Sequence, residues 1–297
     1  MNRSIEGIIV PVVTPFNEKE EIDEKALRVI LDFLIQHGVH GLFPVGSQGE
    51  FFALTMDEKK RLIDLVLEEV AGRVFVMPNT GAITTKACIE LSKHAEAAGA
   101  DAVSVITPFF IKPSQEELYH YYREIAEAVN LPVFAYNNPS RTGVDLLPET
   151  AAKLARDVAN FAGIKDSSGD LSQTAEYIRL CPEGFKTFVG CDTLIYPALM
   201  CGAVGAVAAT ANVVPDLVVG IYNAVRAGEF DEARYLQRKL APLRQAFSLG
   251  TFPVVVKDAM EMIGLPAGKA RRPIRSLQGE QREKLATILK ELGVFNS

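Results

Sequence analysis

The chain has 297 residues, 48% of them hydrophobic, and a mean hydropathy of +0.12, which indicates a large buried core and excludes a disordered protein. The formal net charge is −6 and no block of Lys or Arg stands out, which argues against a nucleic acid or an anionic membrane as partner. A small acidic substrate remains compatible with this charge, because a single arginine can bind one.

Short apolar runs alternate along the chain with amphipathic stretches. The runs predict buried strands at residues 7–13, 41–45, 74–78, 102–106, 132–136, 161–165, 187–190 and 205–209. The stretches between them predict helices at about residues 23–38, 55–71, 84–98, from 114 onward, 148–158, 172–180, 194–201 and 215–227. Thr55-x-x-Glu58 and Ser114-x-x-Glu117 are capping boxes that mark two of the helix starts.

Eight strand–helix units of roughly 25 to 30 residues are the number that closes a (β/α)8 TIM barrel, so the predicted fold class is α/β. A doubly wound open sheet is the alternative. It would usually carry a Gly-rich phosphate turn after the first strand, where this chain has Thr14-Pro-Phe-Asn.

The last 70 or so residues predict three more helices, at about 230–249, 254–263 and 278–292. No linker long enough for an independent domain precedes them. We therefore expect residues 1–227 to form the barrel with the active site. Residues 228–297 are expected to form a helical extension packed on the barrel, where it covers the mouth or supports a contact between subunits.

Cysteines and histidines are few and form no ligand pattern. The histidines include no H-x-x-x-H or H-x-x-E-H pair, so no metal site is expected: His37, His40, His94 and His120. The cysteines include no C-x-x-C pair and indicate reduced thiols of a cytoplasmic protein: Cys88, Cys181, Cys191 and Cys201. The N-terminus has no apolar signal segment, and no apolar run reaches membrane length.

The predicted strand at 161–165 ends on Lys165, directly before polar and glycine residues. The end of a buried strand is a poor place for a charge, so the pKa of this amine should be lowered and part of it should be neutral. A neutral amine in a pocket attacks a carbonyl carbon and forms a Schiff base. The alternative is a lysine that simply leaves the strand for solvent.

Barrel active sites lie at the carboxyl ends of the strands, where Tyr136 should stand beside Lys165, about 4.8 Å away across two neighbouring strands. A phenol there can move protons during imine chemistry, although Tyr136 alone could equally be a core aromatic bonded to the backbone.

Two further features lie at strand ends. The turn at residues 46–49 offers consecutive backbone N–H groups for a carboxylate, with the Ser47 hydroxyl as a relay, unless it is an ordinary turn. Arg141 can bind a second carboxylate through two hydrogen bonds, or else be solvated or paired with Asp145. Glu50 is either part of this site or a structural acid at a helix start.

Together these motifs resemble the dihydrodipicolinate synthase / N-acetylneuraminate lyase family of class I, Schiff-base-forming lyases, over essentially the whole chain. The matching motifs are G-[ST]-x-G-E at 46–50, Y-N-x-P at 136–139 and G-x-K-[DE] at 163–166. The resemblance implies a barrel with a C-terminal helical extension and a homotetramer built from tight dimers, or a homodimer. No metal or organic cofactor is expected.

The resemblance also implies roles for single residues. Lys165 would form the imine with pyruvate or another 2-keto acid, and Tyr136 would transfer protons. Ser47 and Gln48 would hold the keto-acid carboxylate, and the backbone carbonyl of Val207 would face the site.

The identity of the aldehyde is less clear from the sequence. Arg141 resembles the arginine with which the synthases bind aspartate semialdehyde. The synthases have Thr-Thr where this chain has Ser47-Gln48, and a relay tyrosine where it has Phe110. The second of these replacements removes a hydroxyl from the proton relay.

The sequence therefore leaves two reactions open, a 4-hydroxy-tetrahydrodipicolinate synthase and an aldolase for 2-keto-3-deoxy sugar acids or 4-hydroxy-2-oxoglutarate. A dehydratase for a deoxy-keto sugar acid and a non-catalytic keto-acid binder are the alternatives. Inhibition by lysine is not expected, because apolar side chains stand where the synthases have polar groups for it: Phe51, Met56 and Ile83.

Overall fold

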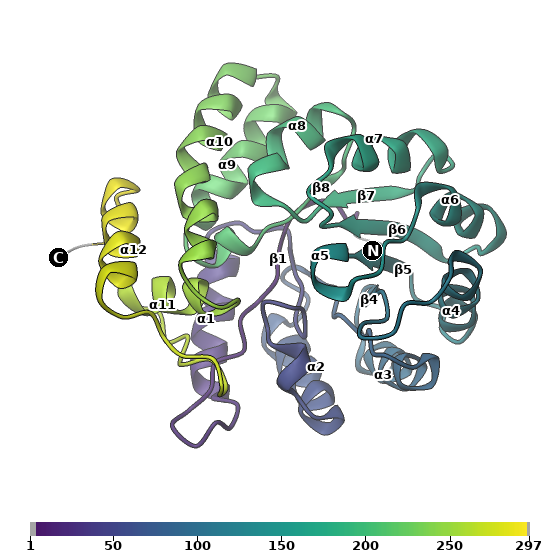
Figure 1. Ribbon diagram of the computed structural model, residues 1–297, viewed down its shortest axis with the longest axis horizontal. Helices are drawn as coiled ribbons and strands as arrows, with labels where there is room; N and C mark the ends of the chain where they lie inside the picture. Colours follow the sequence, from purple (N-terminus) through teal and green to yellow (C-terminus); the bar gives the residue numbers. More distant parts are fainter. Residues whose placement is uncertain (1–3, 296–297) are drawn as a thin grey trace.

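The computed structural model describes residues 4–295, and this part of the chain forms eight parallel strands with helices around them (Figure 1). The strand order is β3-β2-β1-β8-β7-β6-β5-β4. The strands are β1 (Gly7–Val10), β2 (Gly41–Leu42), β3 (Phe75–Val76), β4 (Val103–Ile106), β5 (Val133–Asn137), β6 (Phe161–Asp166), β7 (Lys186–Val189) and β8 (Gly205–Val207).

The two outermost strands of this order, β3 and β4, are joined by a parallel bridge between Asn79 and Ser104. The Ser104 N–H donates to the Pro78 carbonyl at 2.9 Å, and the Thr80 N–H donates to the Ser104 carbonyl at 2.7 Å. These bonds close the sheet, and the predicted (β/α)8 barrel is confirmed.

Eight helices alternate with the strands within the described residues and bury their apolar faces against them. They are α1 (Glu24–Gln36), α2 (Met56–Val70), α3 (Thr85–Ala98), α4 (Gln115–Glu127), α6 (Pro148–Asp157), α7 (Leu171–Leu180), α8 (Ile195–Met200) and α9 (Pro215–Ala227). Both predicted capping boxes are formed, at the starts of α2 and α4. None of the helices within residues 4–295 is long and apolar enough to cross a membrane.

Several strands are shorter than the apolar runs that predicted them. The run at 41–45 gives only the two residues of β2, although backbone hydrogen bonds to the neighbouring strands continue as far as Pro44, before the chain turns at Val45, whose φ is +58°. Four short helical segments at the mouth were not predicted, because three or four residues carry no periodicity: η1 (Phe51–Ala53), α5 (Pro139–Thr142), η2 (Asp192–Leu194) and η3 (Ala209–Asn212).

After the eighth unit come α10 (Phe230–Gln245), η4 (Ala246–Leu249), α11 (Val254–Met262) and α12 (Gly279–Glu291). Figure 1 shows α10 running along α9, with α12 at the outer edge of the molecule. The predicted helix at 230–249 is interrupted in its last turns, where Pro242 lies inside α10 and the 3₁₀ segment η4 follows. The division into residues 1–227 and 228–297 remains a prediction.

A buried ion pair connects α11 to the barrel mouth. Lys257 and Glu50 both have fully buried side chains, and the lysine Nζ lies 2.7 Å from Glu50 Oε1. The Lys257 ammonium also donates to the Lys269 carbonyl at 3.0 Å. Burial lowers the pKa of Lys257, and the Glu50 carboxylate opposes that shift. Glu50 is therefore a structural acid, the second of the two roles that the sequence left open for it.

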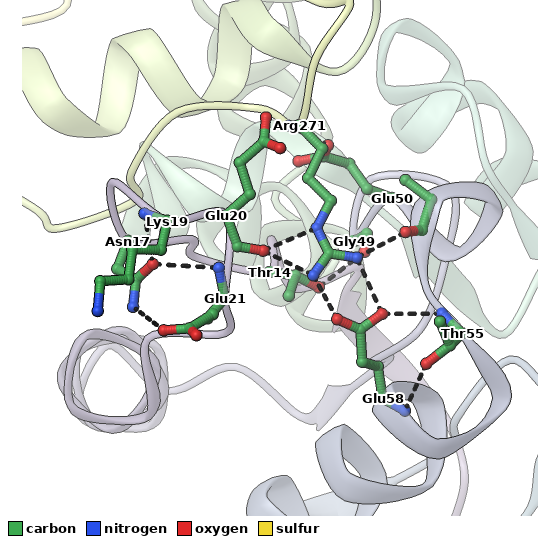
Figure 2. A network of polar contacts seen from close by, with 11 residues as sticks. Thr14, Asn17, Lys19, Glu20, Glu21, Gly49, Glu50, Thr55, Glu58 and Arg271 are labelled. Atoms are coloured by element: carbon green, nitrogen blue, oxygen red, sulfur yellow. Dashed lines mark hydrogen bonds and ion pairs between the residues drawn. The ribbon is translucent and has the colours of Figure 1, made fainter.

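Arg271 extends this connection to the loops around the mouth (Figure 2). Its backbone N–H donates to Glu50 Oε2 at 3.0 Å, and its guanidinium donates to the carbonyls of Ala53 and Glu20 and to the Glu58 carboxylate. The hydrogen bonds from Arg271 lower the pKa of Glu58 to about 2. The segment after α11 is thus held against the loop that carries Ser47 and Gln48.

We predict that Lys257→Met lowers the free energy of unfolding by about 3 to 5 kcal/mol, because it leaves the Glu50 carboxylate buried without a partner. Urea denaturation followed by circular dichroism measures this loss. Combining the substitution with Glu50→Gln should recover most of it, since the buried charge is then gone. Lys269→Met is the control, because it breaks an exposed pair with Glu18 and should cost less than about 1 kcal/mol. Equal losses for Lys257→Met and Lys269→Met would contradict the prediction.

Candidate active site

The carboxyl ends of the strands surround a cavity of about 420 Å³. Tyr136 and Lys165 are register partners on β5 and β6, as the sequence predicted. The cavity is lined by all six residues to which the sequence analysis gave roles in the site: Ser47, Gln48, Tyr136, Arg141, Lys165 and Val207. Val207 is the last residue of β8.

The Lys165 side chain is 4% exposed and does not leave the strand for solvent. Its Nζ lies 3.7 Å from the centre of the Tyr136 ring and 4.4 Å from the centre of the Phe43 ring. Burial lowers the pKa of Lys165, while Tyr136 and Asp192 oppose that shift with their negative charge. Gly190 leaves room for this arrangement, because a Cβ there would lie 1.9 Å from Ser167 Oγ and 3.2 Å from Lys165 Cε.

The Tyr136 hydroxyl contacts side chains rather than the backbone. It lies 3.2 Å from Ser47 Oγ, and the Asn138 amide donates to it at 3.0 Å. Burial alone would raise the pKa of this phenol, but the Lys165 ammonium and the hydrogen bonds with Ser47 and Asn138 lower it overall. The phenol is therefore placed beside the amine, where it can exchange a proton with groups at that position.

The turn at residues 46–49 is held in a strained conformation at both ends. Val45 and Glu50 both have positive φ, +58° and +57°, which is rare for residues other than glycine. Within residues 4–295 the backbone N–H groups of Ser47 and Gln48 make no hydrogen bond, so both are available to a carboxylate. The Gln48 side chain faces away from this task, because its amide donates to the Pro253 carbonyl at 3.1 Å.

Arg141 lies on α5, and its guanidinium stacks over the Phe252 ring at 4.6 Å. It forms no ion pair within the described residues, and the alternative pairing with Asp145 does not occur. Asp145 instead accepts hydrogen bonds from Asn137 and Gln173. Arg141 is therefore an exposed cation at the mouth with its donors unused.

Sequence reasoning missed several polar residues that line the cavity, among them Asn138, Asp192 and Arg244. Asn138 could have been found, because it follows Tyr136 at a strand end. Asp192 lies on η2, directly after β7, in a stretch to which we assigned no function. Arg244 comes from α10. The sequence left open that the C-terminal extension covers the mouth, but no pattern indicated which of its residues would reach the cavity.

Phe110 is not among the residues that line the cavity. Its side chain is 93% exposed, and its φ of +73° is unusual for an aromatic residue. No group of three or more His, Cys, Asp or Glu side chains within residues 4–295 is arranged to hold a metal ion.

Comparison with known proteins places this geometry in a family. The sequence model of the dihydrodipicolinate synthetase family matches residues 4–292 of this chain. The 4-hydroxy-tetrahydrodipicolinate synthase of Methanopyrus kandleri is 40% identical over 296 residues, which cover 99% of each chain. That of Methanocaldococcus jannaschii is 39% identical over 289 residues, 97% of this chain and 99% of the relative.

Solved structures agree with these sequences. The crystal structure of dihydrodipicolinate synthase from Aquifex aeolicus has a TM-score of 0.95 at 31% identity and covers 99% of this chain and 100% of its own. A prophage protein of the same family from E. coli K12, solved with pyruvate, has a TM-score of 0.95 at 34% identity, with 98% and 99% covered. The chain thus belongs to the dihydrodipicolinate synthetase family, whose enzymes are class I, Schiff-base-forming lyases.

Proposed function

We propose that this enzyme joins pyruvate to aspartate semialdehyde, as a 4-hydroxy-tetrahydrodipicolinate synthase. The observation that carries the proposal is the buried amine of Lys165 in contact with the Tyr136 ring at adjacent strand ends. Two relatives about 40% identical over nearly the whole chain bear that name. A small keto acid and a small aldehyde fit a cavity of about 420 Å³.

The chemistry starts when the neutral Lys165 amine attacks C2 of pyruvate and forms a carbinolamine. Loss of water gives a protonated imine, which withdraws electrons and allows a proton to leave C3. The resulting enamine attacks the aldehyde carbon through C3, and the aldehyde oxygen takes up a proton. Hydrolysis of the imine, or attack on it by the amino group of the product, then returns the free lysine.

Tyr136 is the group that moves these protons in our proposal, because its hydroxyl lies beside Lys165 and its pKa is lowered. Ser47 and Asn138 hydrogen-bond to the same hydroxyl and orient it. The backbone N–H groups of Ser47 and Gln48 would bind the carboxylate of pyruvate, and Val207 would present its carbonyl to the site. Arg141 would bind the carboxylate of the aldehyde.

Phe110 favours a second candidate, the keto-acid aldolase. Without a hydroxyl at this position the proton relay expected of a synthase is shorter, and a simple aldol reaction needs fewer proton transfers.

The exposed Phe110 ring also supports our proposal that a second copy of the chain covers it, in a homodimer or homotetramer. The free cysteines support a cytoplasmic location. Insensitivity to lysine remains a prediction.

We predict that incubation with pyruvate and borohydride adds one pyruvate-sized mass to the native chain and none to Lys165→Ala, because Lys165 is the lysine that lines the cavity and its burial favours the neutral, nucleophilic amine. Intact-mass spectrometry measures the adduct. Lys186→Ala is the control. Lys186 is the first residue of β7, at the end of the barrel away from the mouth, so this variant should react like the native chain. An adduct on Lys165→Ala would refute the assignment of Lys165.

Tyr136→Phe should lower kcat about 100-fold or more, because it removes the proton carrier and leaves the lysine. Adduct formation in the native chain should rise with pH and level off below the ordinary pKa of lysine, since burial favours the neutral amine. Tyr136 raises the pKa of Lys165, so the variant's rise should occur at lower pH. Rates of adduct formation, quenched with borohydride between pH 6 and 10, test the rise with pH in the native chain and its shift in the variant. Tyr119→Phe, which is remote from the cavity, should change neither kcat nor this pH dependence. An unchanged kcat in Tyr136→Phe would exclude the role.

Pyruvate consumption should be fastest with aspartate semialdehyde in a panel that also contains glyceraldehyde and glyoxylate. Arg141→Ala should raise the KM for aspartate semialdehyde about tenfold or more and leave the pyruvate adduct unchanged, because it removes a charged donor from the aldehyde alone. Arg123→Ala, on the outer face of α4, is the control. Faster consumption with glyceraldehyde or glyoxylate would favour the aldolase instead.

A further inference from the structure

Arg244 reaches the active-site cavity from α10, outside the eight strand–helix units. The Gln237 side chain fixes this helix above β7, since it accepts from the Tyr196 N–H at 2.8 Å and donates to the Asp192 carbonyl at 2.9 Å. Gln237, the buried Leu240 and Arg244 are spaced by three and four residues and share one face of the helix. The contact that fixes α10 therefore also directs Arg244 to the cavity that contains Lys165.

Arg244 shares two features with Arg141, a place in the lining of the cavity and an aromatic ring under its guanidinium. Its guanidinium stacks over the Phe247 ring at 4.9 Å, as that of Arg141 stacks over the Phe252 ring at 4.6 Å. Neither arginine forms an ion pair within residues 4–295. Stacking on a ring positions a guanidinium and leaves the N–H donors in its plane free. Two oriented cations with unused donors thus line one cavity.

Asp192, which lines the same cavity, forms no ion pair with Arg244. Asp192 is 1% exposed, and its oxygens accept from the N–H groups of Ala209 at 3.2 Å and Thr210 at 2.9 Å. Burial raises the pKa of Asp192, and the charge of Arg244 lowers it only in part. Asp192 therefore joins the ends of β7 and β8, and the donors of Arg244 are left for a ligand.

On the basis of the proposed function, we propose that Arg244 and Arg141 together bind an acid group at the far end of the aldehyde. The aldehyde is then one with a distal carboxylate or phosphate, because both oxyanions match the paired donors of a guanidinium. The carboxylate of pyruvate is a different anion, since the backbone N–H groups at Ser47 and Gln48 lie on another loop. Arg244 would thus discriminate acidic from neutral aldehydes.

Keto acids that resemble the product of joining pyruvate to the aldehyde test the role of Arg244 without a complete catalytic cycle. Each forms the Lys165 imine and places its distal group where the aldehyde would lie. Two pairs differ in the acid group: 2-oxopimelate against 2-oxoheptanoate, and 2-keto-3-deoxy-6-phosphogluconate against 2-keto-3-deoxygluconate. The measurement is the concentration of each that gives half-maximal borohydride-trapped adduct, by intact mass, on the native chain.

Arg244→Ala should weaken trapping of an acidic member about tenfold and leave its neutral partner and pyruvate unchanged, because a charged hydrogen bond is lost. Arg244→Lys should recover only part of the difference, since an ammonium cannot form two parallel bonds. Arg238→Ala is the matched control, an exposed arginine of the same helix that does not line the cavity. If Arg244→Ala weakens trapping of the acidic member of the first pair, the acid group is a carboxylate; if it weakens trapping of the acidic member of the second pair, the acid group is a phosphate. Either result supports the proposal.

Three results would overturn the inference while leaving the Schiff-base chemistry intact. The native chain could trap pyruvate and show no preference for the acidic members. Arg244→Ala could retain that preference in full, or the native chain could trap pyruvate but no member of either pair. Failure to trap pyruvate at all would instead contradict the proposed function, so the two failures are distinguishable.

Discussion

A buried amine that has to be partly neutral is the constraint on which the rest of the site depends. Lys165 lies at the end of β6 against the rings of Phe43 and Tyr136, and this burial lowers its pKa. The barrel provides the burial, because parallel strands leave their carboxyl ends around one enclosed space. Its register places Tyr136 across from Lys165, and Gly190 leaves space for the lysine stem. The strand register alone therefore places the phenol next to the amine.

The C-terminal helices complete the mouth that the barrel leaves open. Arg244, Phe247 and Phe252 line the cavity from the chain after β8, and the Pro253 carbonyl binds the Gln48 amide. The barrel strands provide the amine and the phenol, whereas the segment from α10 to α11 provides the outer wall. If Arg244 binds the acceptor, as we propose, recognition of the aldehyde can change through this segment without altering the lysine, as is typical of a fold that supports different substrates through its mouth.

The sequence predicted the barrel and the inner site because both follow from local patterns. Apolar runs mark parallel strands, and a lysine or tyrosine at the end of such a run can only lie at the mouth. The same reasoning could not find Arg244, since its position depends on how α10 packs and on the Gln237 contact with residues 192 and 196. It also missed the direction of the Gln48 amide, because Pro253 is 205 residues away in the chain. Tertiary packing decides both.

Strain and a buried ion pair meet at the two ends of the turn that carries Ser47. Positive φ at Val45 and Glu50 costs roughly 1 to 3 kcal/mol at each residue, so other contacts have to hold this conformation. Glu50 makes those contacts with Lys257 and with the Arg271 N–H. An apolar pair would fill the same space with less desolvation, but it would not fix the direction of the backbone at residue 50. We therefore interpret the ion pair as the contact that fixes the two unused N–H groups in the position where we propose that they bind the keto acid, with stability as a secondary result.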